Sequence, residues 1–401
     1  MEADMKRLVL ASWYTPNSNG SWGLPLLLEG PPGSGKTEWI DALAQEAGLM
    51  NVQMLSPALH GEGAFGVVPM GDTRNGVKVL DYPVPAWAEP FLDTPERDAA
   101  PGLVFVDEVK SADRGLQPPL LGLIRERRVG FTQFGKLVRV IGATNKADEA
   151  ANGNALSAPL ANRFGHIAFE LSSESWHSWL VSGSGTGSNS ELIEAVERER
   201  VLRDWTTPFA TSRGLVSAFL KRRPALEHVQ PPTRDPSSGY AWPSRRTWEL
   251  ALRALTSSVV HKLDDSTRDT YCAAFIGDAA WSEFVLWRDK QDIPDPADLL
   301  DGKVQWSHDA RRLDRTDAVL TACLSLVCPE SKDEPLAKLQ RRTRTAKLWQ
   351  LLQPIVEVAA DIAADAATQL IKSRLATSAD ARPVLVSLSP MLQAAGLMPR
   401  V

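Results

Sequence analysis

The fold of this chain is decided by one stretch, Gly30-Pro31-Pro32-Gly33-Ser34-Gly35-Lys36-Thr37. It fits the pattern G-x-x-x-x-G-K-[ST] at every position, between an apolar run at 24–28 and a helix-forming segment at 39–47. In such a strand–loop–helix unit the backbone N–H groups and the helix N-terminus point at an anion. Lys36 is expected to reach the terminal phosphates, and the Thr37 hydroxyl to ligate magnesium. Residues 30–37 are therefore predicted to bind a nucleoside triphosphate.

Further short apolar runs follow this loop, at 52–55, 103–106 and 138–143. They are rich in Val, Ile and Leu, which is typical of buried parallel strands, and helical stretches separate them. The pattern predicts an α/β core over residues 1–172, with a parallel sheet covered by helices. Within it, the Gly- and Pro-rich segment 56–91 is too long for a simple connection and is predicted to be a structured insertion.

Beyond residue 172 the strand pattern fades, and helical periodicity predicts a helical domain at 173–301 and a helical region at 302–401. A length of 401 residues suits two or three domains, and a formal net charge of −5 argues against a surface that coats nucleic acid broadly. The three cysteines fit a reducing compartment and show no zinc-site spacing. No apolar window reaches the length of a membrane span. We expect a cytoplasmic protein.

Two carboxylates end the predicted strand at 103–106. Asp107 at the strand's carboxyl end is placed to hold the magnesium ion, usually through water. Glu108, one residue on, is placed to orient and deprotonate an attacking water. Paired acidic residues at a strand end are often only a helix cap, but a phosphate-binding loop upstream favours the catalytic interpretation.

Two further polar residues follow in the order that such chemistry requires. Asn145 ends the apolar run that starts at Val138, so its amide is expected beside the γ-phosphate, where it positions the water. Arg163 lies in Leu160-Ala-Asn-Arg-Phe164, where the neighbouring aromatic residue fixes the backbone. An arginine held in this way can reach the γ-phosphate of a neighbouring subunit, and such a residue raises rates by orders of magnitude.

In this order the segments resemble the AAA+ ATPases, and the MoxR-like branch in particular, over residues 20–300. The resemblance is carried by GPPGSGKT (30–37), VFVDE (104–108), GATN (142–145), APLANRF (158–164) and WPSRRTWE (242–249). It implies a homo-oligomeric ring, usually a hexamer, with ATP and Mg2+ at each subunit interface. It also implies a helical lid that carries a sensor arginine, best matched by Arg246. The family's Ser-Pro-Arg reads Ser244-Arg245-Arg246 here, so Arg245 is a second candidate for the sensor arginine. Whether that arginine acts on the nucleotide of its own subunit or of a neighbouring one stays open.

The resemblance also gives meaning to two insertions. Residues 56–91 match the insertion in the second helix, and residues 126–138 match a hairpin before the first sensor, with a glycine-containing turn around 132–135. In a ring both would face the pore, where Phe131, Phe134 and Lys136 would grip a substrate; hairpin packing explains the aromatic residues equally well. Proteins of this branch often remodel a protein client, in some cases one with a von Willebrand A domain.

Three alternatives remain. Asn145-Lys-Ala-Asp148 reproduces the guanine-specific pattern N-K-x-D, although Asp107-Glu-Val-Lys110 lacks the glycine of D-x-x-G. A nucleic-acid motor would use the local basic residues Arg125, Arg127, Arg128 and Lys136, against the acidic overall balance. A scaffold that binds nucleotide without turnover is disfavoured because Glu108 and Arg163 are both present. The sequence therefore favours a magnesium-dependent ATPase that remodels another protein.

Overall fold

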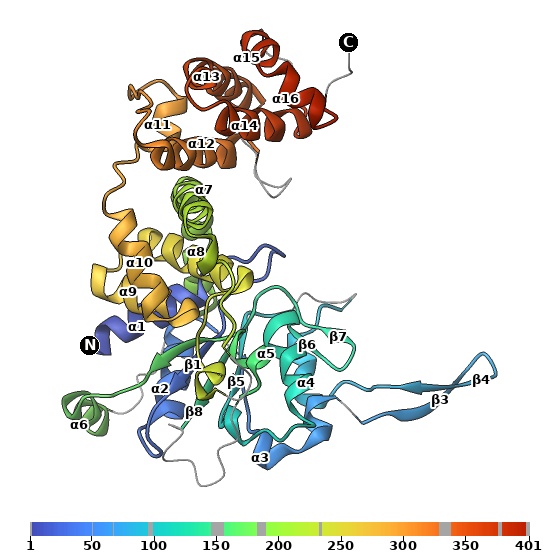
Figure 1. Cartoon of the computed structure of the whole chain (residues 1–401). Coiled ribbons are helices and arrows are strands. Elements are labelled where there is room, and N and C mark those ends of the chain that lie inside the picture. The colour runs from blue at the N-terminus through green and yellow to red at the C-terminus, as the bar shows by residue number, and fades with distance from the viewer. Residues whose placement is uncertain are drawn as a thin grey trace. The chain divides into compact units, whose positions relative to one another are not determined.

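A computed structural model of the chain describes residues 2–49, 51–66, 68–94, 99–145, 156–182, 190–231, 235–328, 338–375 and 379–397. By its internal contacts the chain divides into two compact units. Unit 1 comprises Met1–Arg203 and Glu227–Trp281, and unit 2 comprises Asp204–Leu226 and Ser282–Val401. Figure 1 shows the α/β part of unit 1 and the helices of unit 2.

Unit 1 is built on a five-stranded sheet in the order β2-β5-β8-β1-β9, and every pair in it is parallel. Its strands are β1 (Leu26–Glu29), β2 (Asn51–Leu55), β5 (Gly102–Val106), β8 (Val138–Thr144) and β9 (Gly165–Ala168). Both β5 and β8 are buried along their whole length, as strands covered on both faces must be. The predicted α/β fold with a parallel sheet is therefore confirmed, and β9 is an additional strand.

Unit 1 also contains several helices. They are α1 (Glu2–Trp13), α2 (Lys36–Glu46), α4 (Gln117–Leu121), which continues into a π-helical turn at Gly122–Glu126, α5 (Ala158–Ala161), α6 (Ser173–Ser182), α8 (Arg245–Val260) and α9 (Asp265–Ile276), together with the first part of α7 (Ser190–Arg222). Helix α8 packs on α9 and on α1, and α9 packs directly on β9. Of the helices that follow the sheet in sequence, α9 thus lies against its last strand.

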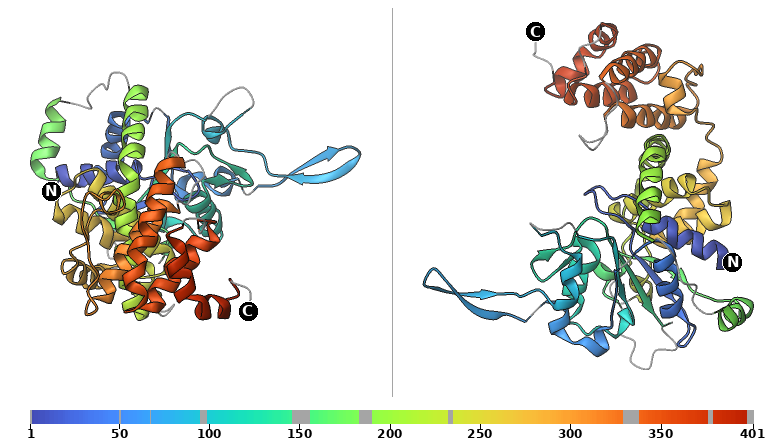
Figure 2. Two further views of the ribbon diagram at one scale, coloured as in Figure 1. Left: turned by 90° about the horizontal axis from the view of Figure 1, so that it is seen from above. Right: turned by 180° about the vertical axis from the view of Figure 1, so that it is seen from behind.

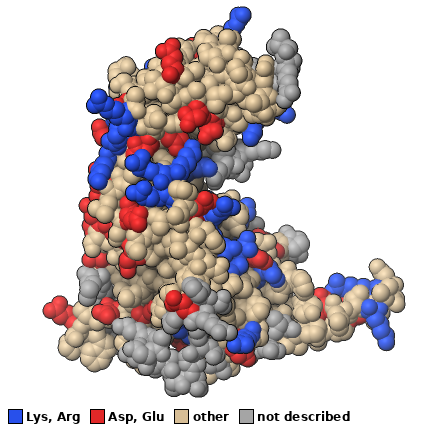
Figure 3. Space-filling view, viewed as in Figure 1, with Lys and Arg blue, Asp and Glu red and all other residues tan. Residues whose placement is uncertain are grey.

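The segment 56–91 contains helix α3 (Pro57–His60), two 3-10 turns (Glu62–Phe65 and Ala86–Phe91) and an antiparallel hairpin of β3 (Met70–Arg74) and β4 (Val77–Asp81). Figures 1 and 2 show this hairpin extending away from the sheet in every view. Arg74 in β3 bonds Asp72 and Asp81, so basic and acidic side chains pair along the hairpin (Figure 3). The hairpin is a solvated arm.

The second predicted hairpin is present, with strands β6 (Arg128–Val129) and β7 (Thr132–Gln133). Its turn is formed by residues 130–131, so the expected turn around 132–135 was wrong. Phe134 is buried against Trp87 and Phe91, so it is a core residue. Its position supports hairpin packing, and not contact with a substrate, as the role of this aromatic side chain. Phe131 at the turn is 78% exposed.

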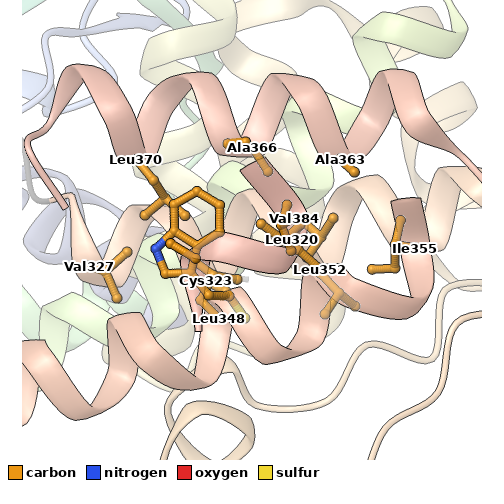
Figure 4. Close-up of a cluster of buried hydrophobic side chains, with 14 of the residues drawn as sticks. Leu320, Cys323, Val327, Leu348, Leu352, Ile355, Ala363, Ala366, Leu370 and Val384 are labelled. Carbon is orange, nitrogen blue, oxygen red and sulfur yellow. The ribbon is translucent and has the colours of Figure 1, made fainter. Parts of the chain in front are cut away.

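Unit 2 is helical, as predicted for the C-terminal region. It contains α11 (Pro296–Leu300), α12 (Leu313–Val327), α13 (Lys338–Val356), α14 (Ala360–Lys372), α15 (Ala381–Ser387) and α16 (Ser389–Ala394), most of α10 (Asp278–Arg288) and the second part of α7. Figure 4 shows its core, where Leu320, Cys323, Leu348, Leu352 and Leu370 meet. Burial raises the pKa of the Cys323 thiol to about 12, so this cysteine is a small core side chain.

The limits of the two units differ from the expected boundaries at residues 172 and 301. Residues 204–226 belong with the C-terminal helices because α7 and α12 approach closely: a Cβ on Gly214 would lie 2.3 Å from the Ala318 carbonyl oxygen. Ala210 of α7 also belongs to the unit 2 core. Within the described ranges, we find no helix that combines the length and apolar character needed to cross a bilayer.

His261, at the end of α8, makes the stability of the protein depend on pH. Burial and the charge of Arg200 lower the pKa of His261 to about 4, although Glu197, 3.9 Å away, opposes this shift. The unfolded chain binds the proton more tightly, so this contribution to stability is complete above the ordinary pKa of about 6.5 and is lost as the pH falls toward 4.

We expect His261 alone to lower the free energy of unfolding by about 3 kcal/mol between neutral pH and pH 4. Chemical denaturation of the wild type and of His261→Phe across this range measures the effect. The variant should lose less stability on acidification than the wild type. Parallel profiles of the two proteins would contradict the prediction.

Candidate active site

The loop at residues 30–37 joins β1 to α2 at the carboxyl edge of the sheet. Gly35 is in the left-handed region, with φ of 78°, and α2 begins at the next residue. At Gly30 the reason for glycine is space, because a Cβ would lie 2.6 Å from the carbonyl oxygen of Phe169. The loop therefore requires glycine at both ends, and the N–H groups of the first turn of α2 face its interior.

Lys36 connects this loop with the neighbouring strand. Its side chain is buried, and Nζ donates to the Gly30 carbonyl at 3.0 Å and the Pro31 carbonyl at 2.8 Å. The Asn145 side-chain oxygen lies 3.4 Å from the same nitrogen. Strands β1 and β8 are adjacent, so their carboxyl ends bring Lys36 and Asn145 together.

Thr37 and Asp107 meet at the place predicted for the metal. The Thr37 hydroxyl donates to Asp107 Oδ2 at 3.3 Å, and Asp107 Oδ1 accepts from the backbone N–H of Glu108 at 2.8 Å. A hydroxyl and a carboxylate are hard oxygen ligands that suit Mg2+, which usually adds waters and substrate phosphates to one or two protein ligands. In the described ranges no group of three or more His, Cys, Asp or Glu residues forms a metal site by itself, so this pair with a phosphate group is the arrangement that fits.

Glu108 lies beside this pair on an unusual backbone. Its φ is 53° and its ψ is 44°, which is the left-handed region, rarely occupied by residues other than glycine and often found at functional sites. Its side chain is exposed, and Glu108 Oε2 accepts from the Ser56 hydroxyl at 3.4 Å. Ser56 directly follows β2, the neighbour of β5. Ser56 could not be recognised from the sequence, since a serine after an apolar strand forms no distinctive pattern.

An ion pair between Lys110 and Glu29 holds the end of β1, directly before the loop at residues 30–37. Lys110 Nζ lies 2.8 Å from Glu29 Oε1, and His166 Nδ1 lies 4.0 Å from the same oxygen. Burial alone would raise the pKa of Glu29, but His166 and Lys110 outweigh it and hold the pKa below its usual range. Lys110 also lies over the ring of Tyr240. Glu29 is the residue before Gly30, so these contacts fix the end of β1, and sequence reasoning missed all of them.

Arg163 and Arg246 lie elsewhere. Arg163 lies two residues before Gly165, the first residue of β9, which pairs with Leu26, the first residue of β1. Because the strands are parallel, Arg163 is at the amino edge of the sheet, whereas the loop at 30–37 is at the carboxyl edge. Four strand residues separate the two edges, about 13 Å. The structure does not bring Arg163 to the phosphate loop of its own chain.

Arg163 and Arg246 instead share a cavity of about 620 Å3, called here the arginine cavity. It is lined by Ala158, Pro159, Asn162, Arg163, His228, Gln230, Trp242, Ser244, Arg245 and Arg246, none of which is acidic. Burial, together with the charges of Arg246 and Arg125, lowers the pKa of Arg163 to about 10, although the charge of Glu126 opposes this shift. Burial and Arg125 also lower the pKa of Arg246. The cavity is a strongly cationic site that suits an anionic group.

The two candidates for the sensor arginine, Arg245 and Arg246, differ in their exposure to solvent. Arg245 is exposed, with 83% of its side chain accessible, and its Nε lies 2.5 Å from Glu227 Oε1. Arg246 is half-buried and close enough to Arg163 for its charge to act on it. The geometry therefore pairs Arg246 with Arg163.

The basic strip considered for nucleic acid is shorter than the sequence suggested. Arg127 is buried, and it donates to the carbonyl oxygens of Gly23 and Ile124, so it is a core residue. Arg128 forms an ion pair with Glu126. The guanine-specific pattern ends at Asp148, which lies outside the described residues.

Replacing Gly30 by alanine tests the close approach at the loop. The added Cβ would displace Phe169, whose backbone N–H bonds the Glu29 carbonyl at 2.7 Å, and the loop would shift with it. We expect Gly30→Ala to weaken ATP binding at least about tenfold and to cost about 1–3 kcal/mol of stability. Gly63→Ala is the matched control, because the nearest atom to its Cβ is 3.8 Å away. Equilibrium binding of a fluorescent ATP analogue measures both variants, and equal affinities would contradict the prediction.

The comparisons with known proteins agree with this geometry. Residues 26–169 match the family model described as "ATPase family associated with various cellular activities (AAA)". No curated protein sequence matches the chain. A solved structure of a candidate ATPase from Cytophaga hutchinsonii is similar at 14% identity and a TM-score of 0.41, covering 70% of this chain and 78% of that chain. A likeness of that size carries no argument about function. The AAA match therefore covers residues 26–169, the part of the chain that contains the phosphate-binding loop and the parallel sheet.

Proposed function

We propose that this protein is a magnesium-dependent ATPase that assembles into a ring and hydrolyses ATP between neighbouring protomers. The observation that carries the proposal is the placement of the candidate residues at two opposite edges of one sheet. One edge has the residues to which we assign nucleotide binding and the activation of water. The other has Arg163 and Arg246 in one cavity, whose described lining residues include no acidic side chain.

At the carboxyl edge each residue has a separate role. Residues 30–35 and the start of α2 bind the phosphates through backbone N–H groups, with Lys36 on the terminal ones. Thr37 and Asp107 hold Mg2+, which neutralises charge on the phosphates during transfer. Glu108 takes the proton of the attacking water, and Asn145 orients that water. The mutual distances around Lys36, Thr37 and Asp107 support these assignments.

The arginine cavity supplies the remaining positive charge to the neighbouring protomer. A side chain at the amino edge cannot reach a phosphate at the carboxyl edge about 13 Å away. One protomer's arginine edge must therefore meet the next protomer's nucleotide edge, and such a head-to-tail contact repeats until a ring closes. Arg163 and Arg246 share one cavity, which supports the proposal that both act across the interface.

The finer identity of the protein rests on the sequence resemblance. The segments at 158–164 and 242–249 support a place in the MoxR-like branch, a hexamer, a cytoplasmic location and a protein client, with a von Willebrand A domain protein as one candidate. The helical lid would be formed by α9, which lies on β9, and by α8, which packs on α9. The exposed hairpin of β3 and β4 and the exposed Phe131 are surfaces that a client would meet.

The proposal is tested by ATP turnover as a function of protein concentration. Turnover per protomer should rise with concentration in step with assembly, measured by analytical ultracentrifugation, and should require Mg2+. Full activity of a dilute monomer would overturn it. The pattern at 145–148 makes GTP the second candidate, so the assay includes competition by GTP and the variant Asp148→Ala. A preference for GTP that Asp148→Ala abolishes would replace the ATP assignment.

A further inference from the structure

Arg163 and Arg246 are held close together although their charges repel. Arg163 follows the short helix α5, and Arg246 lies in the first turn of α8, 83 residues later in the chain (246 minus 163). The pKa of Arg163 is lowered in part by Arg246, and no acidic residue lines the cavity that they share. Two separate elements that carry like charges would move apart unless other contacts joined them.

A buried amide and a buried hydroxyl make that connection. Asn162 Nδ2 donates to the Trp242 carbonyl at 3.2 Å, and Asn162 Oδ1 accepts from the Ser244 hydroxyl at 2.9 Å. Asn162 is 4% exposed and Ser244 is 5% exposed. Both contacts are therefore shielded from water, which makes their loss costly. Asn162 directly precedes Arg163, and Ser244 lies two residues before Arg246.

The same hydroxyl starts the sensor helix. Ser244 Oγ accepts from the Thr247 backbone N–H at 3.2 Å, and Thr247 Oγ1 accepts from the Ser244 backbone N–H at 2.8 Å, which is a capping box. A serine hydroxyl has one proton, so donating it to Asn162 leaves its lone pairs for the cap. Thr247 Oγ1 is also 3.0 Å from the Trp242 carbonyl. The network closes on itself without a charged group.

We infer that Asn162 and Ser244 form a clamp that makes Arg163 and Arg246 one rigid unit, so that both arginines engage and leave a neighbour's nucleotide together. The inference rests on the proposed function and adds two positioning residues to it. Neither side chain touches the nucleotide in this scheme. Asn162 and Ser244 act by fixing the positions of the two guanidinium groups.

Kinetics of single variants give the first test. Asn162→Ala and Ser244→Ala should each lower kcat by about ten- to a hundredfold, because a small misplacement of a catalytic group has effects of that size. Their affinity for ATP at their own intact loop should stay within about twofold. Ser244→Thr keeps the hydroxyl and should recover most of the activity. Asp264→Ala is the matched control, because it removes the cap of α9, a Thr267 contact of 3.0 Å, without touching the clamp.

Mixing with Glu108→Gln gives the second test. Glu108→Gln protomers keep the clamp and the arginines, whereas Asn162→Ala protomers keep the catalytic Glu108. At a mixed interface the Glu108→Gln protomer supplies its arginines to the intact nucleotide site of an Asn162→Ala protomer. The mixture should therefore exceed the summed activity of the two separate proteins. The control is a mixture of Arg163→Ala with Glu108→Gln, in which activity should also be restored. If that control regains activity while the Asn162→Ala mixture shows only the sum of its two separate activities, the clamp is wrong.

The outcomes separate the clamp from the function that it serves. If Arg163→Ala lowers kcat and both clamp variants match Asp264→Ala, the clamp is wrong and the ATPase proposal stands. If Arg163→Ala itself retains full activity, the function across protomers fails, and the clamp fails with it. Thermal melts of each variant show whether a loss of kcat merely follows a loss of folded protein.

Discussion

Replacing Arg163 by alanine is expected to lower kcat for ATP hydrolysis by about 10^3-fold, the smaller end of the range for arginines donated in trans. Arg163 stands at the amino edge of the sheet in a cavity without acidic residues, and its pKa, about 10, still leaves it charged at neutral pH. No phosphate loop of its own chain lies within its reach. Under the proposed function, its charge acts on the γ-phosphate that a second protomer supplies.

The affinity of Arg163→Ala for ATP separates this role from a structural one. The variant keeps Lys36 and Thr37, so binding of a fluorescent ATP analogue should change by no more than about twofold, while steady-state turnover falls. Arg245→Ala is the matched control, because Arg245 lines the same cavity but is exposed and paired with Glu227. Turnover of Arg163→Ala at the wild-type rate would remove the interface from the mechanism.

The sequence predicted those parts of the fold and the site that depend on local pattern. Four of the five sheet strands follow from apolar runs, and the loop at 30–37 follows from its glycines and its flanking elements. The meeting of Lys36 and Asn145 also follows, because parallel strands bring their carboxyl ends to one edge. Such features need only a few neighbouring residues and the rules of parallel sheets.

Tertiary packing decided the elements that the sequence misjudged. Strand β9 is Gly165-His-Ile-Ala168, too short and too mixed to stand out, and it is a strand because it pairs with β1. A Cβ on Gly165 would lie 2.8 Å from the Phe275 ring, so α9 also presses on it. The turn of the second hairpin is at residues 130–131, where Gly130 has a positive φ of 54°, whereas Gly135 lies where a Cβ would be 2.2 Å from Ala99.

The supporting contacts of the site were beyond sequence reasoning for a related reason. Ser56–Glu108, Glu29–Lys110 and Asn162–Ser244 join residues that are 52, 81 and 82 positions apart. None of these pairs has a spacing that periodicity can detect, and each consists of residue types that are common on surfaces. The arrangement of Arg163 with Arg246 is of the same kind, since it depends on where β9 and α8 meet the rest of unit 1.

Replacing Glu108 by glutamine is the second large effect that we expect, a fall in kcat of about 10^3-fold with ATP still bound. Glutamine has nearly the same size and keeps an oxygen that accepts from the Ser56 hydroxyl, but it cannot take a proton from water. The metal pair of Thr37 and Asp107 is left intact. Substrate should therefore bind normally and remain uncleaved.

Trapped ATP should then stabilise the assembly. A ligand that binds the assembled state more tightly than the free protomer shifts the equilibrium toward assembly, by at most RT ln(1 + [L]/Kd), which is about 2.7 kcal/mol at a hundredfold excess over Kd. Analytical ultracentrifugation of Glu108→Gln with ATP and Mg2+ should show larger particles at lower protein concentration than for the wild type. Glu38→Gln, which alters an exposed carboxylate in the first turn of α2, should leave turnover and assembly unchanged. Unchanged turnover in Glu108→Gln would mean that another group takes the proton. Lost turnover without any increase in assembly would contradict the proposal that the arginine cavity binds the nucleotide of a neighbouring protomer.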